Sequence, residues 1–198
     1  MQAESHSTIH ITGAITLDSV SIDISATVWD ISTFAPEWFA EALAESRNRQ
    51  GPQARRREIL FAVCCAESYL FEWIRDEVLK RDFSKLSTYF KPGIKDNVLT
   101  KWKKVPKQLA QAKLIQAAPH FHNWGEFCQL VNYRNGLVHG VASRPQTFRQ
   151  PPDIEKPVPS KATLDALSPG WAVGVVVTLV QHLHNAAGTH PPTWLVHP

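Results

Sequence analysis

The sequence lacks the segments that mark several common classes of protein. No apolar run in its 198 residues reaches the ~18 that a membrane-spanning helix needs. The first residues show no basic region followed by an apolar stretch, so we expect no signal peptide. The three cysteines, two of them adjacent, are odd in number and form no disulfide framework. These absences favour a protein of the reducing cytoplasm that does not contact a membrane.

Two kinds of functional site are also missing. The sequence has no glycine-rich loop of the kind that cradles phosphate groups, which argues against nucleotide hydrolysis. The nearest approaches to a metal site are His120 and His122 with Cys128, or His182 and His184 with His190. Their spacings match no closed zinc pattern, so histidines on helix surfaces or at helix ends explain them better. We therefore expect no metal ion and no cofactor.

The composition is typical of one large folded domain. Hydrophobic residues make up 43% of the chain and charged residues 20%, which excludes disorder for most of it. Seven Trp and nine Phe predict a well-filled core. The net charge of +3 is unevenly spread, because residues 51–113 carry fourteen basic and seven acidic side chains. An anionic partner is therefore expected to meet this middle region.

The chain begins with a pattern of period two. Apolar residues alternate over residues 8–29 and change parity at Asp18-Ser19, which predicts a β-hairpin. An isolated hairpin is marginally stable in water, so it is expected to pack on another element. We divide the chain into an N-terminal β-hairpin extension, residues 1–34, and a helical domain, residues 35–198.

The rest of the chain predicts a mostly α fold, a helical bundle. One helix begins near Pro36, and a long helix covers residues 54–80. Shorter helices follow within residues 84–116, broken at Pro92-Gly93 and at Pro106.

The last third of the chain predicts two more helices. One begins at Asn123, with Glu126 completing a capping box, and ends at Gly140. The prolines of residues 143–160 predict an extended connector. The last helix begins at Ser168-Pro169 and ends at Gly188, and its apolar first half should be buried against other helices or a partner.

Charged residues fall on the apolar stripes of two of these helices. At about 100° per residue, Arg134 lies between Leu130 and Val131 on its stripe. Asn135 and His139 are four residues apart and share the edge of that stripe. An arginine, an amide and an imidazole therefore converge where aliphatic side chains are expected.

The long helix repeats this anomaly at Glu67, which lies between Val63 and Phe71. A carboxylate there needs a partner, because desolvating a lone charge is very costly. A buried Arg–Glu bridge that only holds two helices together explains both charges. A functional site explains them equally well, because such polar intrusions often mark one.

The motif Tyr133-Arg-Asn-Gly-Leu-Val-His-Gly140 resembles that of the HEPN superfamily, helical bundles with an Arg, four to six residues and then a His. The stretch Ala66-Glu-Ser-Tyr-Leu-Phe-Glu-Trp-Ile74 resembles the earlier helix of that bundle, where an acidic residue faces the site. The likeness covers about residues 54–140. The hairpin and the proline-rich connector have no counterpart in this resemblance.

The resemblance implies a metal-independent endoribonuclease of toxin or phage-defence type, acting as a homodimer. In that role His139 is the general acid or base, Arg134 holds the scissile phosphate, and Asn135 and Glu67 orient them. The chemistry agrees, because His titrates near neutrality and Arg clamps phosphate. An antitoxin or an effector protein would be a further partner. The alternative is a non-catalytic HEPN-like module that binds a protein, a nucleotide or RNA.

A lysine-rich segment lies between the two stretches that carry the resemblance. Its lysines stand against one acid, Asp96: Lys91, Lys95, Lys101, Lys103, Lys104, Lys107 and Lys113. With Trp102 among them, the segment predicts an RNA-binding patch centred on Lys101, Trp102, Lys103, Lys104 and Lys107. A solvated helix face is the alternative.

Overall fold

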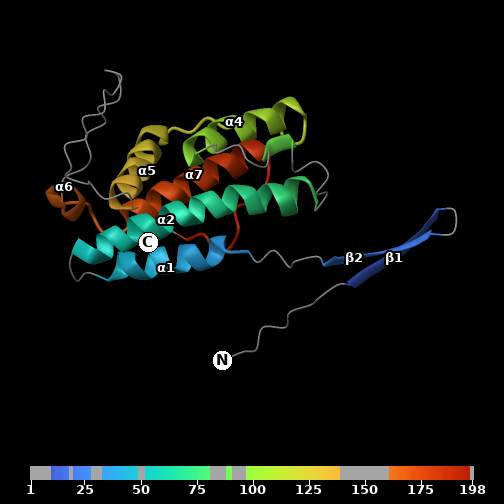
Figure 1. The fold of residues 1–198 in the computed structure, drawn as a ribbon. Coiled ribbons are helices and arrows are strands. Elements are labelled where there is room, and N and C mark those ends of the chain that lie inside the picture. Colours follow the sequence, from blue (N-terminus) through green and yellow to red (C-terminus); the bar gives the residue numbers. More distant parts are fainter. Residues whose placement is uncertain are drawn as a thin grey trace, which may run out of the picture. The chain divides into compact units, whose positions relative to one another are not determined.

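The computed structural model describes residues 10–17, 20–27, 33–48, 52–80, 88–90, 97–138 and 161–196. The chain divides into two compact units, Met1–Thr33 and Phe34–Pro198. In the first unit, strand β1 (His10–Leu17) pairs antiparallel with β2 (Val20–Thr27), with Leu17 opposite Val20 (Figure 1). The expectation that this hairpin packs on another element stays a prediction.

The second unit is a bundle of helices, which confirms the mostly α prediction (Figure 1). Its elements are α1 (Ala35–Arg47), α2 (Pro52–Trp73), the π-helical turn η1 (Ile74–Val78), α4 (Val98–Gln111), α5 (Trp124–Val138), α6 (Lys161–Asp165) and α7 (Trp171–Ala187). Among the described helices, none combines the length and apolarity that crossing a membrane requires. Gly140, the break at Pro92-Gly93 and the connector at residues 143–160 lie outside the described residues.

Helix α7 is the apolar centre of the bundle. It packs against α1, α2 and α5. Val173, Val176, Leu179 and Leu183 are each fully buried by the chain itself. The apolar sequence of α7 is thus explained by its own bundle, and it gives no support to an interface with a second copy.

A carboxylate of α2 caps the start of α7. Glu58 is buried, and its oxygens accept hydrogen bonds from the backbone N–H groups of Gly170 at 3.2 Å and Ala172 at 3.0 Å. The first N–H groups of a helix lack partners within it, and negative charge is favourable there. Arg55, one turn earlier on α2, pairs with the same carboxylate. This buried pair fixes the N-terminal end of α7 against α2.

A second carboxylate of α2 does the same for α1. Glu72 accepts from the backbone N–H groups of Phe34 at 2.7 Å and Ala35 at 3.2 Å. Burial raises the pKa of Glu72 above its ordinary value, and the two backbone hydrogen bonds oppose that rise. Two of the helices that pack against α2, α1 and α7, are therefore capped by acidic residues of α2.

Two local predictions for the helices are wrong. Pro106 lies inside α4 and does not end it, because Trp102, Val105 and Leu109 anchor that helix by burial on both sides of the proline. Asn123 forms no capping box: its amide donates to the Val175 carbonyl at 2.9 Å, and its buried Oδ1 has no hydrogen-bond partner among the described residues. Here tertiary contacts override the local signals.

Candidate functional site

Glu67 and Arg134 meet between α2 and α5. The Arg134 Nη2 and Glu67 Oε2 atoms are 4.0 Å apart, and Arg134 Nη1 donates to Asn135 Oδ1 at 3.1 Å. The Lys101 ammonium of α4 lies 3.7 Å from Glu67 Oε1. Three helices thus bring together one carboxylate, two cations and an amide, which we call the Glu67–Arg134 cluster.

The charged side chains of the cluster are more exposed to solvent than the helical wheels predicted. The side chain of Glu67 is 40% exposed and that of Arg134 is 28% exposed. Their separation allows an ion pair but exceeds a hydrogen bond. The expectation of a dry, hydrogen-bonded pair is therefore wrong. The buried face of α2 is centred near Ala62 and Ala66, and Glu67 lies at its edge.

The charges of this cluster act on the thiol of Cys64. Burial raises the pKa of the Cys64 thiol, Arg134 lowers it, and Glu67 raises it. The net rise keeps the thiol protonated near neutral pH, and a protonated thiol is a poor nucleophile. Cys64 is therefore a half-buried packing residue.

His139, the proposed acid–base residue, lies outside the described residues. Helix α5 ends at Val138, so the described chain stops one residue before it. Arg134 and Asn135 are both on the last turns of α5. The expected meeting of His139 with Arg134 stays a prediction.

Lys91 and Lys95 of the lysine-rich segment lie outside the described residues, and its lysines on α4 do not form one stripe. On α4, Trp102, Val105 and Leu109 make the buried face, and Lys101 lies on one side of it towards Glu67. Lys103 and Lys107 are four residues apart on the other side, and both are exposed. Lys104 is exposed as well.

Trp102 is not available to stack on a base. It is 0% exposed, and its indole N–H donates to the Ala66 carbonyl of α2 at 3.0 Å. Its ring packs edge-on against Phe121 and Phe127, with 5.9 Å between centroids in each case. The predicted role of Trp102 in RNA stacking is therefore corrected to a role in the core.

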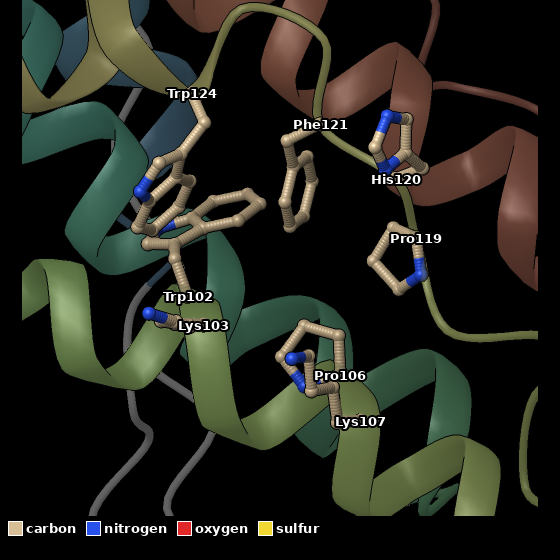
Figure 2. Close-up of a pocket in the computed structure, with 8 residues that line it drawn as sticks. All are labelled: Trp102, Lys103, Pro106, Lys107, Pro119, His120, Phe121 and Trp124. Atoms are coloured by element: carbon tan, nitrogen blue, oxygen red, sulfur yellow. The ribbon is translucent and has the colours of Figure 1, made fainter.

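A pocket lies beside Trp102. Its volume is about 260 Å³, and Figure 2 shows that its walls come from α4, from the segment before α5 and from the first residue of α5. The lining residues are Trp102, Lys103, Pro106, Lys107, Pro119, His120, Phe121 and Trp124. Phe121 and Trp124 are half-buried and stacked, with centroids 5.8 Å apart. Beyond the lysines, sequence reasoning missed this pocket, although a run of aromatic and proline residues just after the lysine-rich segment was a usable signal.

Histidines from the two weak metal-site candidates of the sequence lie close together. The rings of His120 and His122 are 4.6 Å apart, and those of His122 and His182 are 5.3 Å apart. Burial, then the neighbouring His122 and His120, lower the pKa of His182. In the described part of the chain, no group of three or more His, Cys, Asp and Glu side chains is arranged to hold a metal ion.

A buried polar chain links α7 to α2. His184 Nε2 shares a hydrogen bond with the Tyr69 hydroxyl, and its Nδ1 shares another with the Thr189 hydroxyl at 2.7 Å. Burial is the largest cause of the rise in the pKa of Tyr69 and of the fall in the pKa of His184. Both groups are therefore neutral near pH 7, and the ring contacts of His184 with Trp73 place it in the core.

Comparison of the chain with family models, with curated proteins and with solved structures gives no match. The features that point to a function are the Glu67–Arg134 cluster and the motif that contains Arg134.

Proposed function

We propose that the chain is a metal-independent endoribonuclease of the HEPN type, with its site at the Glu67–Arg134 cluster. The observation that supports this is the position of Arg134: its guanidinium is partly exposed near the end of α5, five residues before His139, with Lys101 close by. Two cations against one half-exposed carboxylate leave the cluster able to attract a phosphate.

The reaction would be transesterification within RNA. The 2′-oxygen attacks the adjacent phosphorus while a base takes its proton, and the P–O5′ bond breaks as an acid protonates the leaving oxygen. The products are a 2′,3′-cyclic phosphate and a 5′-hydroxyl. His139 would perform one of the proton transfers and Arg134 would stabilise the charge on the phosphorane.

Glu67 and Asn135 would be positioning residues. Asn135 accepts a hydrogen bond from Arg134, which directs the guanidinium. Glu67 lies at ion-pair distance, and a pair this exposed is weak enough for a phosphate to replace the carboxylate. We propose that the active form is a homodimer, because one chain supplies one motif histidine and two proton transfers are needed. A toxin or phage-defence role, with an antitoxin or effector partner, belongs to the same proposal.

Cleavage of a generic RNA by the purified protein tests this function. We expect activity that survives EDTA, cyclic phosphate ends, and a loss of about 10²–10⁴-fold in His139→Ala. Arg134→Lys should lose activity as well, because a lysine cannot make the two-pronged phosphate contact. Activity that needs added magnesium, or a His139→Ala protein as fast as the unmodified one, would contradict the mechanism.

A non-catalytic binding module is the second candidate. It is favoured by the same carboxylate, because Glu67 lies within ion-pair distance of both Arg134 and Lys101 and partly neutralises them. Binding of RNA without cleavage, under conditions where the strand is intact after hours, would select this reading.

A further inference from the structure

The pocket between α4 and the segment before α5 has flat, half-buried walls. The Phe121 and Trp124 rings stack with an interplanar angle of 29°, and Pro106 and Pro119 complete the wall (Figure 2). Phe121 is held from behind by the buried Trp102 ring. Rigid aromatic faces of this kind bind other flat rings by stacking.

The edge of this pocket is cationic. Lys103 and Lys107 are exposed, lie one helical turn apart on α4, and both line the pocket with His120. Among the described residues that line it there is no carboxylate. The walls therefore suit an apolar ring, and the edge suits the negative charge attached to that ring.

The volume limits the occupant to one small ring system. About 260 Å³ lies below the usual range of pockets for drug-sized ligands, roughly 300–1,000 Å³. A nucleobase combines a ring of this size with phosphate at a short distance, which an isolated aromatic compound does not.

We propose that this pocket binds one unpaired base of a single-stranded RNA, with the flanking phosphates on Lys103 and Lys107. Exposed lysines on an open helix face suit a backbone that passes across them, because an ammonium is a mobile point charge that tracks phosphates without enclosing them. The inference does not need the Glu67–Arg134 cluster to cleave, so it stands or falls separately from the proposed function.

Binding is measured with a short 2′-O-methyl oligoadenylate, which has no free 2′-hydroxyl and is not cleaved by the proposed reaction. Fluorescence anisotropy compares it with a strand of equal length whose bases are removed. Stacking of one base predicts about ten-fold tighter binding of the strand with bases. Equal affinity for the two strands would overturn the proposal, since the lysines would then act as an unspecific charged face.

Variants test the two parts of the pocket. Lys103→Gln with Lys107→Gln should lower the slope of log affinity against log salt by about 1.4, from two lost phosphate contacts. Lys80→Gln with Lys113→Gln removes two exposed charges outside the pocket and is the matched control. Equal slopes for the two double variants would overturn the assignment of the lysines.

Trp124→Leu should weaken binding of the strand with bases by about ten-fold and leave the strand without bases unaffected. Trp38→Leu removes another half-buried indole, one stacked on Phe61 at 5.7 Å, and is its control for folding. Trp124→Leu binding both strands as the unmodified protein does would overturn the stacking role.

Competition by free adenosine monophosphate identifies the source of the base. We expect the oligonucleotide to compete at least ten-fold better per molecule, because further phosphates reach the lysines. Equal competition would overturn the single-strand occupant in favour of a free nucleotide. Base-dependent binding without any RNA cleavage would sustain this pocket and contradict the proposed endoribonuclease.

Discussion

Two glutamates on α2 carry the same charge in different surroundings. Glu58 is 1% exposed and is bonded by Arg55 and by the first N–H groups of α7, whereas the side chain of Glu67 is 40% exposed. Water competes with the ion pairs of Glu67 but not with those of Glu58. Glu58 therefore contributes strongly to the stability of the bundle. Glu67 contributes little to stability and can take part in other contacts at the surface.

Glu67→Ala should lower the free energy of unfolding by less than about 1 kcal/mol, as is usual for exposed pairs. Glu58→Ala should cost about 3–5 kcal/mol, because Arg55 is left buried without its carboxylate and α7 loses its cap. Urea titrations at one pH measure both values. Equal losses in the two variants would show that Glu67 is as dry as the helical wheel suggested.

Glycine at the end of α7 is a requirement of the backbone. Gly188 has φ +73°, and a Cβ there would come within 2.0 Å of the Gln116 amide nitrogen. Gly188→Ala should lower the free energy of unfolding by about 1–2 kcal/mol, from the left-handed conformation. Since Gln116 is an exposed, flexible side chain, adding Gln116→Ala should restore only the part that is due to the clash. Full recovery in the double variant would mean that the backbone conformation costs nothing.

The contact of α7 with α2 should depend on pH through His184. Burial lowers its pKa, Glu77 opposes this and His190 adds to it, so the folded protein disfavours the charged form. The unfolded chain binds this proton near pH 6.5. The stability contributed by neutral His184 is therefore full above that pH and is lost as the pH falls through it towards the folded-state pKa.

Denaturant titrations at pH 7.5 and pH 5.5 check this. The unmodified protein should be less stable at the lower pH, and His184→Gln should reduce the difference. Part of it should persist, because the pKa of His182 is lowered as well. His190→Gln, an exposed position, is the control and should keep most of the difference. A His184→Gln protein with the full pH dependence would assign the effect to other groups.

At the scale of elements, the boundaries of α1, of α2 with η1, and of α7 follow from sequence periodicity, from Pro36 and from Gly188. The orientation of α2 could not be obtained by counting aliphatic residues, because Ile59, Val63 and Leu70 cover only one side of its buried face. The other side consists of small, aromatic and acidic residues at spacings of four and three: Glu58, Ala62, Cys65, Tyr69 and Glu72. That spacing was a readable signal, and it would have placed Glu58 and Glu72 inside and Glu67 at the edge.

The candidate site follows from sequence only in part. The proximity of Arg134, Asn135 and Glu67 is confirmed, because helix spacing and one buried stripe on α5 were enough to bring them together. The pairing of Lys101 with Glu67 depends on how α4 crosses α2, which no local pattern encodes. The pocket likewise requires Phe121 and Trp124 to fold back on α4, a tertiary arrangement.

At the scale of the whole molecule, we expect a homodimer for reasons other than the apolarity of α7. The apolar helix α7 is covered by its own chain, so it does not call for a second copy. What favours two copies is the supply of one motif histidine per chain, together with an exposed apolar side chain within the motif. Val138, the last residue of α5, is 53% exposed.

A two-fold interface that brings both copies of His139 near the axis would cover Val138 in each copy. We therefore expect a dimer at micromolar concentration by light scattering. Val138→Glu should shift it to monomer, because the interface would bury two like charges close together. Leu114→Glu, a position 40% exposed after the end of α4, adds the same charge and should leave the dimer intact. A monomeric unmodified protein would remove the shared site and leave Arg134 to act within one chain, whereas a dimer that both variants leave unchanged would place the interface away from the motif.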